Sequence, residues 1–183
     1  MRRVTVAWDK DAGRFVALGT HRERTIHING PAEPGSGRPP TGFSATELLL
    51  AGAGACAAWD VVEILRKRRA RLSGLDVTVE SDQLPDPPWT YQRIAVHFRV
   101  GCDEMSVPVL ARVVRLSVVR YCSVITTVAG VAAIEATVEL VDGSGGSSGR
   151  HHVELALPYV APAGMSENDA EALGIEQATV DED

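Results

Sequence analysis

Alternating apolar and polar residues open the chain and predict three short strands. The segments Arg3–Trp8, Phe15–Gly19 and Thr25–Ile28 alternate or carry β-branched side chains, and turn-forming residues separate them. The next stretch, residues 30–42, is rich in glycine and proline and predicts a loop. We therefore expect the chain to begin with a small sheet.

At Ser44 the pattern changes to that of a long, capped helix. Ser44 and Glu47 have the spacing of a capping box, in which each side chain bonds the backbone N–H of the other residue. The helix is expected to run to about Ala70, with Gly74 as a stop signal. Its first half is apolar on every side, which predicts a buried helix. The small residues Ala51–Ala55 predict close approach of another helix or of a ligand.

Two longer strands, a second helix and a further strand are predicted after the first helix. They are the strands Leu75–Ser81 and Tyr91–Gly101, a helix from about Ser106 to Ala129, and the strand Ile134–Val141. The second helix is expected to break near Cys122. The order βββ-α-ββ-α-β, with the helices segregated from the hairpins, predicts an α+β fold.

The C-terminal segment differs from the rest of the chain. Residues 1–142 are predicted to form the folded domain, 143–149 a Gly/Ser linker, and 150–183 an extension with a short strand and an acidic flexible tail. Residues 151–183 contain eight acidic residues and no lysine or arginine. The net charge of −6 therefore belongs to the tail and not to the domain.

Composition narrows the location and the partners. With 45% hydrophobic and 23% charged residues, the chain has the composition of a soluble globular protein. No stretch is expected to cross a membrane, and the basic N-terminus lacks the apolar region of a signal peptide. Three cysteines without close pairing indicate a reducing, cytoplasmic location. The one basic cluster, residues 66–69, stands where the predicted helix ends, and its positive charge complements the helix dipole. It therefore does not indicate a binding patch, and neither a nucleic acid nor a membrane is expected as a partner.

Cys56 and Cys122 are the residues with the clearest potential for chemistry. If folding brings them together, they form a nucleophile and a resolving thiol, because a sulfenic acid is protected when a second thiol condenses with it. Each cysteine is also compatible with a small apolar position in the core, and for Cys122 taken alone this interpretation is favoured. Cys102, beside Asp103 and Glu104, is interpreted as structural.

A reactive Cys56 would need a compensating charge. Asp60 lies one helical turn beyond it and would raise the pKa of the thiol. A cation from elsewhere is therefore expected, and the candidates are Arg14, Arg22, Arg24 and Arg38. The sequence has no metal-ligand cluster, phosphate loop or dinucleotide motif, so no metal and no cofactor are predicted.

Two segments together resemble a known family. The stretch from Ser44 to Lys67, with Cys56 in its centre, resembles the helix of the OsmC/Ohr family of osmotically induced and organic hydroperoxide resistance proteins. The stretch Leu116–Val124 resembles the family's second cysteine site. The sequence after Cys56 is similar to the less characterised OsmC-like branch. The resemblance covers about residues 1–142.

The resemblance implies both a fold and an activity. It implies an intertwined α+β homodimer, in which two long central helices pack against antiparallel sheets and the active sites lie at the interface. Cys56 would be the peroxidatic thiolate and Cys122 the resolving thiol. Glu47 would help to activate the thiol, one position nearer to the cysteine than is usual in the family.

The implied activity is the reduction of organic hydroperoxides in oxidative stress defence, with recycling by a dithiol such as a lipoylated protein. The alternative is a non-catalytic dimer of the same fold that binds a small apolar or thiol ligand at its interface.

Overall fold

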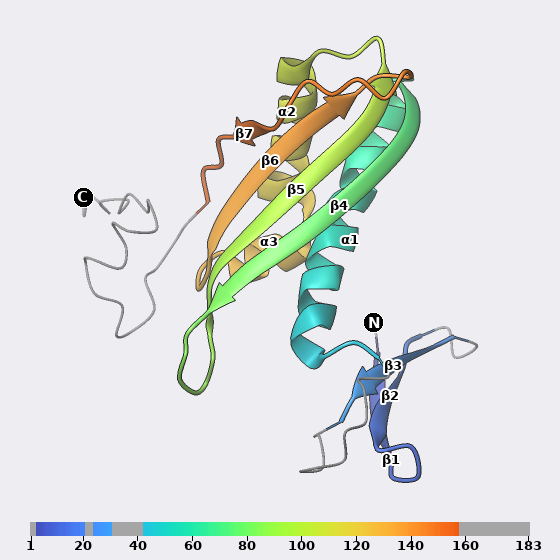
Figure 1. Ribbon diagram of the computed structural model, residues 1–183, viewed down its shortest axis with the longest axis vertical. Helices are drawn as coiled ribbons and strands as arrows, with labels where there is room; N and C mark the ends of the chain where they lie inside the picture. The colour runs from blue at the N-terminus through green and yellow to red at the C-terminus, as the bar shows by residue number, and fades with distance from the viewer. Residues whose placement is uncertain (1–2, 21–23, 31–41, 158–183) are drawn as a thin grey trace. The chain divides into compact units, whose positions relative to one another are not determined.

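The computed structural model describes residues 3–20, 24–30 and 42–157 (Figure 1). The chain divides into two compact units, Met1–Ala51 and Gly52–Asp183, and each is described by itself. The loop predicted over 30–42 lies mainly outside the described residues, as does the acidic tail.

The first unit is built on a three-stranded antiparallel sheet. Its strands are β1 (Thr5–Asp9), β2 (Arg14–Leu18) and β3 (Thr25–Asn29), paired in the order β1-β2-β3. They agree with the three predicted strands to within two residues at each end. Trp8 and Phe15 face each other across β1 and β2, with ring centroids 4.9 Å apart. Val6 and Trp8 nevertheless remain 55% and 50% exposed, so this sheet has an uncovered apolar face.

Helix α1 (Ala45–Lys67) begins at the predicted capping box. The Glu47 backbone N–H donates to Ser44 Oγ at 3.1 Å, and the Ser44 N–H donates to Glu47 Oε2 at 2.7 Å. The predicted stop at Gly74 is wrong, because Gly74 lies inside the following strand. The helix instead ends before Arg69, which has a left-handed backbone with φ 58°. A non-glycine residue in that conformation leaves no sequence signal.

The helix buries only one side within the chain. Its buried residues form a stripe at near-helical spacing: Ala53, Gly54, Ala57, Val61 and Leu65. A Cβ at Gly54 would lie 2.9 Å from Val79 Cγ2, so the predicted close neighbour is a strand of the sheet. The expectation that the first half of this helix is buried on every side is wrong, since Ala51 and Ala55 are exposed.

By length and composition alone, helix α1 is long and apolar enough to cross a membrane. This finding corrects the expectation that no stretch of the chain is long and apolar enough to do so. Only 28% of its most apolar window is buried inside the chain.

A four-stranded sheet forms the frame of the second unit. Its strands, in the order β4-β5-β6-β7, are β4 (Arg71–Gln83), β5 (Tyr91–Asp103), β6 (Ala133–Val141) and β7 (His151–Val153). The predicted strands are confirmed, and β4 and β5 are longer than expected. The sheet is mixed, because β6 runs parallel to β5. The expectation of purely antiparallel sheets is therefore wrong, and the crossover from β5 to β6 carries the remaining helices.

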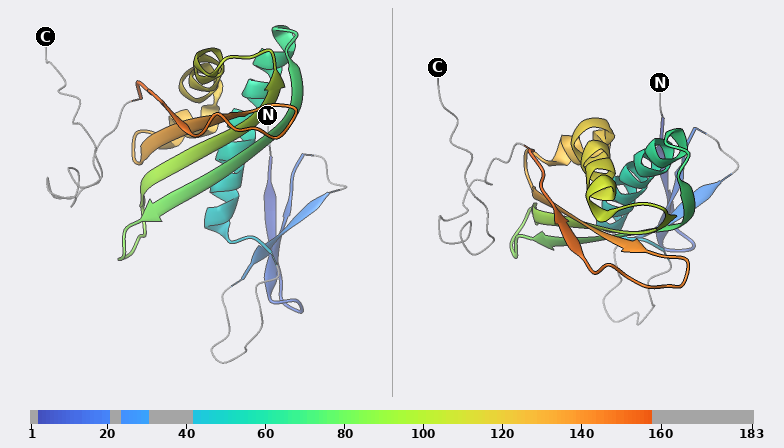
Figure 2. Two further views of the ribbon diagram at one scale, coloured as in Figure 1. Left: turned by 45° about the horizontal axis from the view of Figure 1, so that its top comes forward. Right: turned by 90° about the horizontal axis from the view of Figure 1, so that it is seen from above.

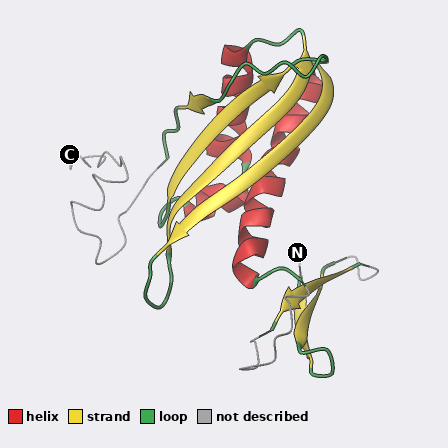
Figure 3. Ribbon diagram, viewed as in Figure 1, coloured by secondary structure: helices red, strands yellow, loops and turns green. Residues whose placement is uncertain are grey.

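The crossover consists of three consecutive helical segments, α2 (Val107–Leu116), the π-helix η1 (Ser117–Tyr121) and α3 (Ser123–Val128). The predicted break near Cys122 is confirmed. In the second unit the helices cover one face of the sheet (Figure 2). Helices and strands are segregated as the α+β prediction required (Figure 3). The buried side chains at alternate positions of β5, from Ile94 to Val100, share one face of the sheet, opposite to that of Arg93 and Arg99.

Charged side chains occupy the other face of β4, β5 and β6. Arg99 lies in register between Asp76 and Glu139, at N–O distances of 4.0 and 3.8 Å. Arg93 forms a two-pronged ion pair with Glu135, with both N–O distances 2.7 Å. These pairs give the strands a polar outer surface.

The predicted Gly/Ser linker contains a hydrogen-bonded turn. Asp142 Oδ1 accepts the backbone N–H groups of Ser144 at 2.9 Å and Gly146 at 2.8 Å. The short strand β7 follows the turn and pairs antiparallel with the edge of β6. Val153 on β7 is 3% exposed, so this part of the extension contributes to the core.

Candidate thiol site

Cys122 occupies the junction between η1 and α3. Its backbone is extended, with φ −72° and ψ 98°, and it is the N-cap residue of α3. The Ile125 N–H donates to Cys122 Sγ at 3.5 Å, and the Cys122 thiol lies 3.8 Å from the Ala53 carbonyl oxygen of α1. Sulfur thus replaces the oxygen that usually caps a helix. The side chain is fully buried.

A second polar contact attaches the junction to α1. The Ser117 hydroxyl, which is also fully buried, donates to the Ala57 carbonyl at 2.8 Å. Ala53 and Ala57 lie on consecutive turns of α1, so the contacts from Ser117 and Cys122 reach the helix on either side of Cys56. A single-turn π-helix of this kind is frequent at functional sites. The arrangement brings Cys122 and Cys56 together.

Cys56 is half-buried, and the pKa of its thiol is lowered. Burial raises the pKa of this thiol, but the backbone N–H of Val124, the Cys122 thiol and the Ser123 hydroxyl together lower it below its ordinary value. Hydrogen bonds to the charged form of a group favour that form. Asp60 acts in the opposite direction and raises the pKa of Cys56. The net effect of these interactions is a lowered pKa of Cys56.

Cys122 has the opposite character. Burial, together with the neighbouring Cys56, raises the pKa of its thiol to about 12, although the Ile125 N–H acts to lower it. The site therefore combines a thiol whose pKa is lowered with a neighbouring thiol whose pKa is raised. Both thiols are free, and the structure holds no disulfide between them.

The expected arginine is not among the leading interactions of Cys56. Of the four candidates, Arg22 and Arg38 lie outside the described residues. Arg14 lies 3.9 Å from Asp9, and Arg24 is exposed. The largest favourable interactions with the thiol come instead from neutral hydrogen-bond donors. Sequence reasoning missed Ser123 and Val124, although the break it placed near Cys122 lies next to both.

The structure places Glu47 at the capping box. Its carboxylate is exposed, and the backbone N–H and hydroxyl of Ser44 lower its pKa. Along one helix, nine residues separate Glu47 from Cys56 by about 13 Å, so Glu47 does not contact the Cys56 of its own chain. Its assigned role in activating the thiol stays a prediction.

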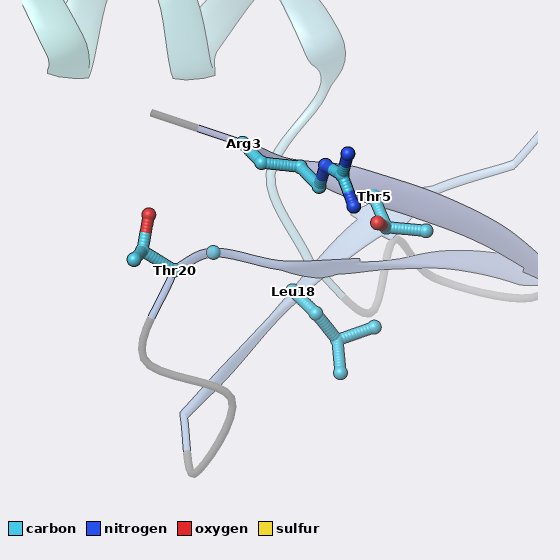
Figure 4. Close-up of a pocket in the computed structure, with 5 residues that line it drawn as sticks. Arg3, Thr5, Leu18 and Thr20 are labelled. Carbon is cyan, nitrogen blue, oxygen red and sulfur yellow. The ribbon is translucent and has the colours of Figure 1, made fainter. Parts of the chain in front are cut away.

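The chain has a third cysteine and, in the first unit, a cavity whose described lining includes neither Cys56 nor Cys122. Burial and Asp103 raise the pKa of Cys102, which ends β5. A cavity of about 460 Å³ in the first unit is lined by residues of β1, β2 and their flanks, namely Arg3, Thr5, Leu18, Gly19 and Thr20 (Figure 4). Its described lining contains no cysteine and no carboxylate. Within the described ranges, no cluster of three metal-ligating side chains occurs.

The fold and the site define an α+β protein with two neighbouring thiols, and comparison with known proteins identifies the family. The family model of OsmC-like proteins matches residues 35–147. The chain therefore belongs to the OsmC-like family, as the resemblance indicated.

Solved structures share this fold. An OsmC-like protein from Mycoplasma pneumoniae superposes with a TM-score of 0.64 at 18% identity, covering 77% of this chain and 97% of the other. An organic hydroperoxide resistance protein from Legionella pneumophila superposes with a TM-score of 0.55 at 12% identity, covering 75% and 96%. At these identities the likeness establishes the fold alone.

A curated relative is closer in sequence but matches over a shorter region. Protein YhfA of Escherichia coli is 37% identical over 81 residues, which are 44% of this chain and 60% of YhfA. The chain thus spans about 60% of the length of the curated relatives it matches. This relative's name gives no activity.

Proposed function

We propose that this protein is a thiol-dependent peroxidase that reduces organic hydroperoxides. One observation carries the proposal, namely the pairing of Cys56, whose pKa is lowered, with the neighbouring Cys122, whose pKa is raised. A thiolate is the nucleophilic form of cysteine, and a neighbouring thiol can condense with the sulfenic acid that the first thiolate forms.

The reaction uses the two sulfurs in turn. The Cys56 thiolate attacks the distal oxygen of the hydroperoxide, the O–O bond breaks, and the alkoxide leaves and takes up a proton to form the alcohol. Cys56 is thereby oxidised to a sulfenic acid. The Cys122 sulfur then attacks the Cys56 sulfur, and the hydroxyl leaves as water with the thiol proton. A dithiol reductant returns two electrons and two protons, which restores both thiols.

Exposed aromatic side chains support an organic substrate. Trp59 lies three residues after Cys56 on the same side of α1 and is 72% exposed. Tyr121, next to Cys122, is 53% exposed, and the Arg120 guanidinium lies 5.9 Å from its ring centroid. An apolar surround favours an organic hydroperoxide over hydrogen peroxide. Solved relatives from Legionella pneumophila and Bacillus subtilis are named organic hydroperoxide resistance proteins.

Uncovered apolar surface supports a homodimer as the working form. Val6 and Trp8 on the first sheet and Trp59 on α1 are at least half exposed within one chain. Burial of such surface is the main driving force of association. In an intertwined dimer, Glu47 of one subunit would lie at the interface and help to activate the thiol there. The proposal places the enzyme in the cytoplasm, in oxidative stress defence, with a lipoylated protein as the dithiol donor and with no nucleic acid or membrane partner.

A peroxide-consumption assay tests the proposal. Wild type, Cys56→Ser, Cys122→Ser and Cys102→Ser are compared with tert-butyl hydroperoxide and dihydrolipoamide. We expect Cys56→Ser to lose turnover and Cys102→Ser to retain it. Cys122→Ser is expected to form the Cys56 sulfenic acid without the intramolecular disulfide. Equal rates of peroxide consumption by wild type and Cys56→Ser would overturn the proposal. Saturable binding of an apolar ligand by wild type and by Cys56→Ser would favour the non-catalytic alternative.

A further inference from the structure

Asp60 is the nearest carboxylate to the proposed nucleophile along α1. It lies four residues after Cys56, a spacing that puts two Cβ atoms about 5–6 Å apart on the same side of a helix. Both side chains are half-buried, so both remain accessible from solvent.

Asp60 has no counter-charge in the described part of the chain. Of the acidic residues on α1, Glu63 is paired with Arg66 at 2.8 Å and Glu47 is bonded to Ser44. No ion pair or hydrogen bond joins Asp60 to any described residue. The Arg120 guanidinium, the nearest cation to the junction in sequence, lies over the Tyr121 ring. The negative charge therefore acts on whatever approaches the Cys56 sulfur.

We propose that Asp60 is a specificity-determining residue, which makes Cys56 react with uncharged electrophiles in preference to anionic ones. The charge selectivity concerns the thiol itself, and its extension to neutral over anionic hydroperoxides rests on the proposed peroxidase function. The helical spacing and the unpaired carboxylate carry the inference. The effect of Asp60 on the pKa of Cys56 is consistent with such proximity.

Coulomb's law sets the size of the effect. Two unit charges about 6 Å apart repel with an energy that corresponds to a roughly threefold change in rate at a dielectric constant of about 80, and a roughly 100-fold change at about 20. The half-buried site lies between these limits. The selectivity is also expected to weaken in high salt, because the Debye length falls from about 10 Å at 0.1 M to about 3 Å at 1 M.

Alkylation of Cys56 by a neutral and an anionic reagent measures this selectivity directly. Iodoacetamide and iodoacetate react alike, with the thiolate sulfur attacking the CH₂ carbon and iodide leaving, but iodoacetate is anionic. Rate constants are measured at Cys56 by peptide mass spectrometry on the full chain. Their ratio is independent of the thiolate fraction, so it separates repulsion of the reagent from any change in the pKa of Cys56.

We expect Asp60→Asn to raise the iodoacetate rate relative to the iodoacetamide rate by at least about threefold at low salt, and by less at 1 M salt. Asp60→Glu should keep the wild-type ratio, because it keeps the charge. Glu63→Gln, which removes a paired carboxylate seven residues from Cys56, should change the ratio by less than about 1.5-fold. An Asp60→Asn ratio within about 1.5-fold of wild type at low salt would overturn the inference.

The peroxide form of the test compares tert-butyl hydroperoxide with a fatty-acid hydroperoxide that carries a free carboxylate. Asp60→Asn is expected to favour the anionic substrate by a similar factor. If wild type consumes neither peroxide but the alkylation ratio shifts, the proposed peroxidase function fails and the charge selectivity of Cys56 stands. If the peroxides turn over and the alkylation ratio stays constant, the function stands and this inference fails.

Discussion

Two glycines of α1, only two residues apart, should respond in opposite ways to the same substitution. A Cβ at Gly54 would lie 2.9 Å from Val79 Cγ2 on β4, a distance that side chains do not adopt without a shift. A Cβ at Gly52 meets nothing within 4 Å in the chain. We therefore expect Gly54→Ala to destabilise the protein relative to Gly52→Ala.

The comparison isolates the contact between helix and strand. Replacing glycine by alanine inside a helix stabilises it by about 1 kcal/mol, and this gain is common to both variants. Overpacking of a buried site costs about 1–3 kcal/mol, and Val79 is β-branched and has little rotamer freedom to move away. The two variants should thus differ in their free energy of unfolding by about 1–3 kcal/mol. Gly52→Ala is expected to be as stable as wild type, or up to about 1 kcal/mol more stable.

Urea unfolding followed by circular dichroism measures the difference. The curves are recorded at several protein concentrations, so that any stability derived from association is separated from that of the chain. If Gly54→Ala proves at least as stable as Gly52→Ala, the close packing of α1 on β4 would be refuted. The Cys56 alkylation rate of both variants then shows whether this packing also positions the thiol.

Three further predictions follow from the same structure. Ser123→Ala should raise the pKa of Cys56, because it removes a donor to the thiolate, whereas Thr127→Ala on the same helix should leave the pH profile of Cys56 alkylation unchanged. Burial raises the folded-state pKa of Cys122 to about 12 from 9.0, so its contribution to stability is complete below pH 9 and is lost as the pH rises toward 12. Wild type should therefore lose stability relative to Cys122→Ser between pH 9 and about pH 10.5, and parallel stability curves would argue against the raised pKa. Val153→Ala on β7 should cost about 2 kcal/mol in urea unfolding, while the exposed neighbour His152→Ala should cost little, and equal effects would show that β7 does not pack as described.

Local signals in the sequence predicted most of the secondary structure. The capping box at Ser44 and Glu47 depends on residues three apart, so the start of α1 could be placed from the sequence. The break at Cys122 was likewise expected near that residue. The end of α1 could not be predicted, because it depends on Arg69 in a left-handed conformation and not on a glycine.

Long-range features were harder to predict. The parallel pairing of β5 with β6 depends on how the crossover packs, and alternation within each strand is the same for either direction. The surroundings of Cys56 were also missed, because Ser123 and Val124 are remote in sequence from α1. The expectation of an activating arginine followed from Asp60 alone. The structure instead provides backbone and hydroxyl donors, which are present in almost any sequence and therefore leave no distinctive motif.

The strand register on the outer face of the sheet has a consequence for how relatives of this chain can diverge. Arg99 on β5 lies between Asp76 on β4 and Glu139 on β6, so one residue interacts with two strands at once. A charge reversal at position 99 alone would place like charges opposite each other on both sides. Positions 76, 99 and 139 should therefore change together as a triplet among related sequences, and that covariation would be visible in an alignment without any measurement on the protein.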